Sequence, residues 1–294
     1  MQTLELFLLE LLSKIKQIMN KLTYEKNKLL GKSAKRKSIA YSQKQVWYGR
    51  VNDWKDLKTT ERDIICCFEN GLSGYMIEMN GDLPGSSGAK KAWSKSWLKD
   101  IETKYAKLVK MTRAAGLWLF VSVVNDNMGK GKYGDTSPKL EKVMAQAQQL
   151  AQIIKKNGAG GVIVQPVAET QTAAGKNFET YCKKELSKFH LVYNGSGGFP
   201  KTLNGFEFRA VHPKSTTTTC PKDAFAVSDH GLIIVELAKD GKYDGTVNEK
   251  KADTWFNTVF KKCGCRVTGY YAFQRKKHDK DTIKILGKLM KKYK

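Results

Sequence analysis

The sequence predicts an α/β fold, a closed (β/α)8 barrel of the TIM type, preceded by an amphipathic helix and a basic linker. Apolar strand patterns alternate with helical patterns over residues 45–294, and parallel strands joined by helices are the simplest geometry for that order. Eight such units match the length of about 250 residues that this barrel needs. The turn after the first strand reads RVNDWK at 50–55 and lacks the glycines that an open nucleotide-binding sheet places there, and the motif GxxxxGK[ST] does not occur in the sequence.

Residues 1–30 are predicted to form an amphipathic helix that serves as an anchor or oligomerisation element. Its apolar stripe consists of a heptad seam, widened by three further side chains: Leu4, Leu8, Leu11, Ile15, Ile18 and Leu22, with Phe7, Leu12 and Met19. The segment lacks the basic leader and small-residue cleavage site of a secretory signal peptide. Three interpretations are open: the stripe packs on the chain's own domain, joins copies of the chain through residues 3–22, or docks on a membrane surface or partner.

Residues 31–44 are predicted to be a linker. Residues 31–38 read GKSAKRKS, which is small and basic, without apolar periodicity. Such a run could also contact phosphates or act as a localisation signal, but a solvated basic linker is the commoner role.

The barrel strands are predicted from apolar runs, of which LWLFVSVV at 117–124 is typical of a strand buried on both faces. The eight expected strands are 45–52, 74–80, 117–124, 162–167, 190–194, 206–211, 224–228 and 268–273. The apolar run 232–237 is left without an assignment.

The helices between these strands are predicted from their start and stop residues. Gly116 ends the second of them, whereas Pro138 starts the third and a glycine-rich run at 158–161 stops it. The expected helices are 59–71, 92–115, 138–157, 173–188, 248–263 and 279–293. The sequence shows no clear helix between the sixth and seventh strands.

Composition and charge limit the classes of protein and of binding partner that the chain can belong to or bind. The 294 residues are 41% hydrophobic and 27% charged, which excludes disorder, and no apolar run is long enough for a transmembrane helix. The net charge of +24 favours a polyanion such as nucleic acid, anionic lipid or an acidic glycan. Nucleic-acid binding rests on this charge alone, because no recognised module is visible, and it would be independent of base sequence.

No cofactor and no metal are predicted. The four histidines are scattered without an HExxH motif, although His212 and His230 could meet beside Asp229. Cys66 and Cys67 are expected to be buried thiols on a helix, and Cys263 and Cys265 lack zinc-site spacing. Reduced thiols favour synthesis in the cytoplasm.

Polar residues gather where the predicted strands end. In a (β/α)8 barrel the chemistry takes place at the carboxyl ends of the strands and in the loops after them, although loops are polar in any protein. The predicted substrate-binding residues are Arg50, Asn52, Asn80, Asn125, Gln165, Tyr193, Asn194, Arg209, His212 and Tyr271.

Three carboxylates are the catalytic candidates. Glu169 shares strand parity with Gln165 and can point into the barrel mouth, or it can cap the following helix. Asp229 is predicted to follow the seventh strand, or to be a turn residue before a glycine. Glu78 lies in an apolar context and needs a partner such as Arg50 or Arg209 if it is buried. A pair of carboxylates across a barrel mouth is what glycoside hydrolysis requires.

The order of strands, with Ala168-Glu169 after the fourth and Ser228-Asp229 after the seventh, resembles glycoside-hydrolase-type (β/α)8 barrels. The chain also resembles phage and prophage proteins that carry such a barrel behind a short helical anchor. The resemblance implies hydrolysis of a cell-wall or other anionic glycan. The large retaining clan has Asn-Glu after the fourth strand and a Glu after the seventh, so the residues here depart from its pattern. A barrel kept for binding or assembly, virion-associated and without turnover, is the alternative.

Overall fold

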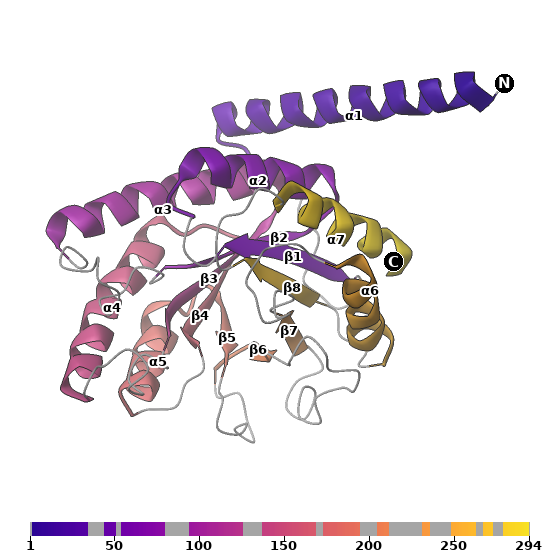
Figure 1. Cartoon of the computed structure of the whole chain (residues 1–294). Coiled ribbons are helices and arrows are strands. Elements are labelled where there is room, and N and C mark those ends of the chain that lie inside the picture. The colour runs from indigo at the N-terminus through magenta and orange to yellow at the C-terminus, as the bar shows by residue number, and fades with distance from the viewer. Residues whose placement is uncertain are drawn as a thin grey trace.

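The computed structural model describes residues 2–34, 44–50, 54–79, 94–125, 137–168, 173–194, 205–211, 231–235, 248–262, 267–272 and 279–293. The chain forms an α/β fold in which a parallel sheet curls on itself, with the helices on its outside (Figure 1). Strand pairing joins β1 through β8 in sequence order and closes β8 onto β1, all in parallel. The predicted parallel barrel is thereby confirmed at the level of architecture.

Eight strands make up the ring. They are β1 Gln45–Arg50, β2 Gly74–Glu78, β3 Trp118–Asn125, β4 Val162–Ala168, β5 His190–Tyr193, β6 Phe208–Val211, β7 Gly231–Val235 and β8 Val267–Ala272. Pairing is long on the β8, β1, β2, β3 and β4 side and short around β5, where Ile163 pairs with His190 and Val192 with Phe208.

Helices follow six of the strands within the described residues. They are α2 Leu57–Glu69, α3 Lys95–Ala115, α4 Ser137–Asn157, α5 Ala173–Glu185, α6 Glu249–Asn257 and α7 Asp279–Tyr293, with a π-helical turn Thr258–Lys262 continuing α6. Local signals set their ends: Ser94 caps α3 by accepting from the Trp97 amide, and Gly116 ends it at φ 67°. The expected helix limits agree closely, and 279–293 is reproduced in full.

The two faces of the sheet bury different sets of side chains. Alternate strand residues fill the inside of the ring and form one apolar cluster: Trp47, Met76, Trp118, Phe120, Ile163, Val192, Phe208 and Val267. The intervening residues, among them Tyr48, Ile77 and Val164, pack outward against the helices in a second, larger cluster. A residue's parity therefore decides whether it faces the lumen or the helix layer.

Gly74 makes room for the Trp47 side chain in the lumen. Its register partner is Trp47, and a Cβ atom added at Gly74 would lie 2.6 Å from the Trp47 indole. The Trp47 and Phe120 ring centroids are 6.2 Å apart. Aromatic and aliphatic side chains thus pack together in the lumen.

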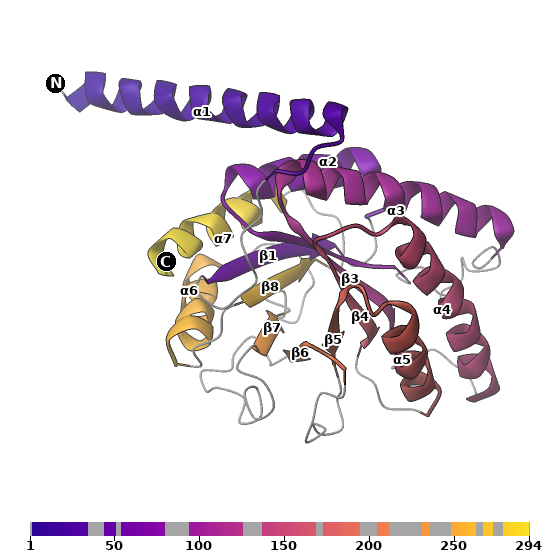
Figure 2. The ribbon, with the colours of Figure 1, turned by 180° about the vertical axis from the view of Figure 1, so that it is seen from behind.

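Helix α1, Gln2–Leu30, lies along the outside of the barrel beside α2 and α3 and extends past them (Figures 1 and 2). Only its last turns are held: Tyr24 is fully buried and donates to Glu61 of α2 at 2.8 Å, and Asn27 donates to the Ala114 carbonyl of α3 at 3.2 Å. The apolar stripe is exposed, with Leu4 at 65% and Leu22 at 62%. The stripe therefore does not pack on the described part of the chain's own domain.

The seventh strand lies later in the sequence than expected. The run left without an assignment supplies β7, Gly231–Val235, which pairs with β6 and β8. The segment 224–228, predicted as that strand, lies outside the described residues. The isoleucines and the valine of Gly231–Val235 favour a strand there.

Candidate functional site at the carboxyl rim of the barrel

A hydrogen-bonded row of polar side chains lines the inside of the ring near the carboxyl ends of three strands. Asn194, which follows β5, donates to Gln165 of β4 through Nδ2–Oε1 at 3.2 Å. Gln165 in turn donates to Ser122 of β3 through Nε2–Oγ at 3.1 Å. All three are 2–3% exposed. We call this set the amide row.

The amide row is placed there by strand parity. Gln165 shares its face with Ile163, which belongs to the lumen cluster, and Ser122 shares its face with Phe120. Each polar group inside an apolar wall needs a partner, and the row supplies one from strand to strand. Two of the predicted substrate-binding residues, Gln165 and Asn194, are thus brought together at the expected rim, and Ser122 joins them.

Glu78 is the catalytic candidate that the structure describes. It is the last residue of β2, is partly exposed, and stands level with Ser122 of the amide row in the β2–β3 register. It shares strand parity with Met76 of the lumen cluster. Its backbone carbonyl accepts a hydrogen bond from the Trp54 indole at 2.9 Å, which fixes the start of the loop after β1 against the end of β2.

Arg50 does not serve the rim as predicted. It has the opposite parity, is 1% exposed, and donates from Nε to Oδ2 of Asp63 in α2 at 2.6 Å. Asp63 is fully buried and is also approached by Arg62 at 3.3 Å. The carboxylate seen beside Arg50 is thus that of Asp63, which the sequence did not predict as its partner. This contact places the last residue of β1 on the side of the helix layer.

Tyr193 also faces outward. Its ring packs at 5.5 Å from that of Phe206, which belongs to the helix-layer cluster. Arg209 pairs with Tyr193 in register, and residues paired in a parallel sheet share a face. Tyr271 pairs with Gly49 on the lumen parity. Side chains of Asn125, Arg209 and Tyr271 are not described, although their backbones lie in β3, β6 and β8.

The remaining predicted site residues lie outside the described residues: Glu169, Asp229, Asn52, Asn80 and His212. The premise for Asp229 was nevertheless wrong, because β7 begins at Gly231, after Asp229, instead of ending before it. The residue that directly follows β7 is Glu236. The sequence analysis missed it, although the apolar run GLIIV followed by a glutamate was the signal that could have found it.

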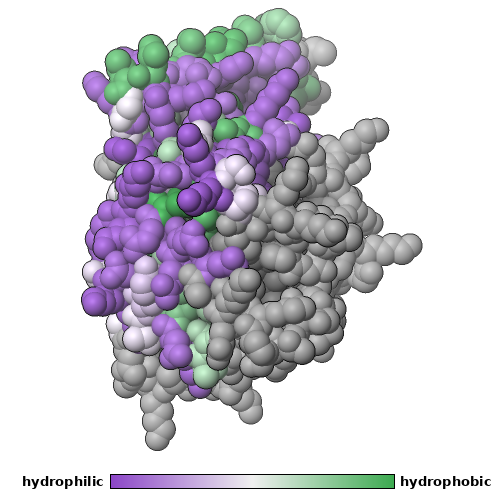
Figure 3. Space-filling model, turned by 90° about the vertical axis from the view of Figure 1, so that its left-hand side faces the viewer, coloured by the Kyte–Doolittle hydropathy of each residue, from purple (hydrophilic) through white to green (hydrophobic). Residues whose placement is uncertain are grey.

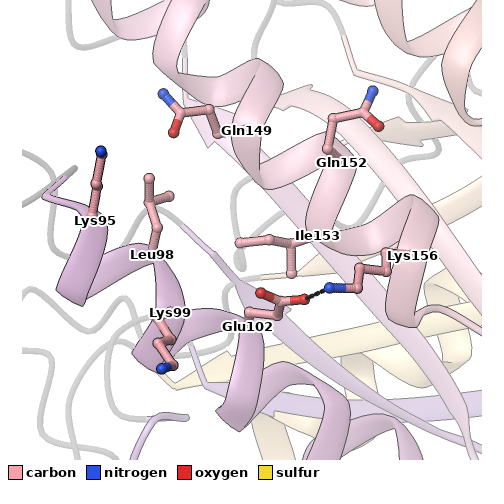
Figure 4. A pocket seen from close by; sticks show the side chains of 8 residues that line it. All are labelled: Lys95, Leu98, Lys99, Glu102, Gln149, Gln152, Ile153 and Lys156. Carbon is pink, nitrogen blue, oxygen red and sulfur yellow. Dashed lines mark ion pairs between the residues drawn. The ribbon is translucent and has the colours of Figure 1, made fainter.

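A surface groove lies between α3 and α4 on the outside of the ring, with a volume of about 540 Å³. Figure 4 shows its side chains coming from both helices, with Lys156 pairing Glu102. That ion pair measures 2.7 Å, and Asn157 donates to the same carboxylate oxygen at 3.3 Å. These bonds hold the pKa of Glu102 below its ordinary value. The carboxylate of Glu102 is already paired with Lys156, and the groove lies away from the carboxyl ends of the strands. The groove is therefore not the candidate site.

The cysteines that the structure describes are structural. Cys66, Cys67 and Cys182 are buried and form no disulfide, as expected for the first two. Burial raises the pKa of Cys66 to about 11 and that of Cys67 well above the ordinary value, so neither is a ready nucleophile. In the described part of the chain, no group of three or more metal-ligating side chains converges, and no helix is long and apolar enough to cross a membrane.

Comparisons with known proteins identify the architecture. No protein-family profile and no curated protein sequence matches the chain. Among solved structures, the chain is similar to a glycoside hydrolase, with a TM-score of 0.54 and 7% identity over 88% of this chain and 73% of that one. It is also similar to a glycoside hydrolase family 5 lichenase from Caldicellulosiruptor sp. F32, with a TM-score of 0.50 and 11% identity over 89% and 97% of the two chains.

A tryptophan synthase from M. tuberculosis matches to the same degree, with a TM-score of 0.51 and 11% identity over 85% of this chain and 94% of that one. At these identities the matches show the fold alone. The chain has a barrel like that of glycoside hydrolases, and the chemistry must be argued from its own residues.

Proposed function

We propose that the chain hydrolyses glycosidic bonds in an anionic or cell-wall glycan, with Glu169 and Glu236 as its two carboxylates. The observation that carries this proposal is the position of the strand ends. β4 ends at Ala168 and β7 ends at Val235, and the next residue after each strand is a glutamate. Because all eight strands are parallel, both glutamates start from the same rim, within one peptide unit of about 3.8 Å from a strand end.

Parity favours the same conclusion. Glu169 has the parity of Gln165 in the amide row, and Glu236 has that of Ile234. Ile234 pairs with Gly269, which pairs with Trp47 of the lumen. A strand that continues by one residue would turn either glutamate inward. This replaces Asp229 by Glu236 as the partner of Glu169.

The chemistry follows the two-carboxylate scheme. Glu169, protonated, gives its proton to the leaving glycosidic oxygen as the bond from that oxygen to the anomeric carbon breaks, while the Glu236 carboxylate bonds to that carbon. Water, deprotonated by Glu169, then attacks the anomeric carbon and releases Glu236. The amide row and Glu78 lie along the same rim and would bind sugar hydroxyls, and the net charge of +24 favours an acidic polymer.

With Glu236 in this role, the chain resembles the large retaining clan more closely, since that clan has a Glu after the seventh strand. One departure is left: Ala168 stands before Glu169, where the clan has Asn. Retention of anomeric configuration is expected, with the two carboxyl groups about 5–5.5 Å apart.

The test is release of reducing ends from a panel of neutral and acidic polysaccharides. Glu169→Gln and Glu236→Gln should each lower turnover by roughly 10²–10⁴-fold, with unchanged thermal unfolding. Asp229→Asn is the matched control and should keep activity. Loss of activity in Asp229→Asn but not in Glu236→Gln would overturn the assignment, and inversion of configuration would exclude Glu236 as nucleophile.

The second candidate function is a barrel that binds without turnover and is held in an assembly by α1. The exposed apolar stripe favours it. Binding of a glycan by the wild type with no cleavage of any polysaccharide in the panel would support it over hydrolysis. Virion association and cytoplasmic synthesis stay predictions from the sequence.

A further inference from the structure

The exposed apolar stripe of α1 points away from the barrel. At about 100° per residue, the stripe covers a continuous arc of about 140°, from Phe7 and Ile18 at one edge to Leu12 at the other. Tyr24, the side chain buried on the barrel, lies about 190° from the centre of that arc. The helix is continuous from Gln2 to Leu30, so docking through Tyr24 fixes the stripe outward. Figure 3 shows hydrophobic side chains gathered along the outer edge of the molecule, at the top of the view.

Lysines stand at both edges of this arc. On the same helical wheel Lys14 and Lys21 lie about 20–40° beyond one edge, whereas Glu5 and Lys16 lie about 20° and 40° beyond the other. Long lysine side chains at such edges reach from an apolar boundary to charged headgroups. Glu10, on the flank of Lys14, is paired with it at 2.7 Å.

We propose that α1 lies flat on anionic lipid membranes, with its apolar stripe among the acyl chains and its flanking lysines at the phosphate level. The stripe from Leu4 to Leu22 would extend about 27 Å along the surface. Leu6 and Leu9 are 66% and 57% exposed but lie outside the arc, so they provide a matched control for the stripe. The excess of positive charge in the whole chain is complementary to such a surface.

Pairing with a second copy fits these residues less well. A two-stranded helical pair buries two positions in seven, which is narrower than this arc. In a parallel pair, Lys21 of one copy and Lys26 of the other would occupy facing positions beside the seam, where two like charges repel. A lipid surface accepts both the width of the arc and the charge at its edges.

The experiment is flotation of the full chain with vesicles of equal parts phosphatidylcholine and phosphatidylserine, compared with phosphatidylcholine alone. We expect binding to the mixed vesicles, weakened by salt. Leu11→Gln with Ile15→Gln should weaken it more than tenfold, whereas Leu6→Gln with Leu9→Gln, the same chemistry outside the arc, should weaken it less. Lys14→Gln with Lys21→Gln should weaken it roughly 30-fold, from about fivefold for each lysine.

The control for charge is Lys176→Gln with Lys184→Gln on α5, on the far side of the barrel from α1 (Figure 1), which should have little effect. All these side chains are exposed, so thermal unfolding should not change and failure to fold cannot imitate the result. Equal binding by the two leucine variants would overturn the proposal. So would a wild type that ignores vesicles but forms oligomers which Leu11→Gln with Ile15→Gln dissociates, because the stripe would then join copies of the chain.

Discussion

The buried Arg50–Asp63 pair links β1 of the sheet to α2 of the helix layer, and its removal should have a large effect. The two side chains are 1% and 0% exposed, and their Nε–Oδ2 distance is 2.6 Å. Replacing one partner breaks this buried contact, and loss of one member of a buried pair typically costs about 3–5 kcal/mol. Arg50→Met and Asp63→Asn should therefore each lower the free energy of unfolding by about that amount.

The double variant tests where this cost arises. Arg50→Met with Asp63→Leu removes both charges and refills the space with apolar atoms, and replacing a buried pair in this way is often neutral or stabilising. The double variant should therefore be more stable than either single variant. Urea unfolding followed by tryptophan fluorescence measures all of them, since Trp47 and Trp54 are fully buried.

Two results would refute this reasoning. If each single variant lowers the free energy of unfolding by less than about 1 kcal/mol, the pair contributes no more than a solvent-exposed salt bridge does. If the wild type cleaves a polysaccharide, the KM of Arg50→Met can be compared with it. A higher KM at unchanged stability would show that Arg50 contacts substrate, contrary to its outward parity.

Two further predictions concern the lumen and the last helices. Gly74→Ala should lower the free energy of unfolding by about 1–3 kcal/mol, because the new methyl group meets the Trp47 indole at 2.6 Å; an unchanged urea midpoint would contradict this packing. Asp253→Asn should cost at most about 1 kcal/mol at neutral pH, because hydrogen bonds from Lys292 and Tyr293 lower the pKa of Asp253. A carboxylate with a lowered pKa stabilises the fold above its ordinary pKa of 3.8, and this is lost as pH falls through the lowered value. The wild type and the variant should therefore converge in acid, and a difference that persists at the lowest pH would count against the ion pair.

Periodicity and breakers were sufficient to predict most of the barrel. The β3 run is apolar throughout because both of its faces are buried, and Gly116 marks the end of α3 because only glycine adopts its φ of 67° without strain. β7 was missed because its five residues read as apolar without alternation, which does not separate a short strand from a buried helix. The α1 stripe is exposed because the helix docks on the barrel through Tyr24. No pattern in the helix sequence predicted that this one residue would be buried.

The candidate site, too, could be predicted from the sequence only in part. Identity and spacing predicted that polar side chains would gather at the strand ends, yet only parity separates Gln165 and Asn194, which meet in the lumen, from Arg50 and Tyr193, which leave it. Parity is set by where each strand begins, and a shift of one residue moves a side chain to the other face. The same rule decides between Asp229 and Glu236. Because β7 is Gly231–Val235, the residue that follows it in the sequence is Glu236 and not Asp229, and this is why we propose Glu236 as the partner of Glu169.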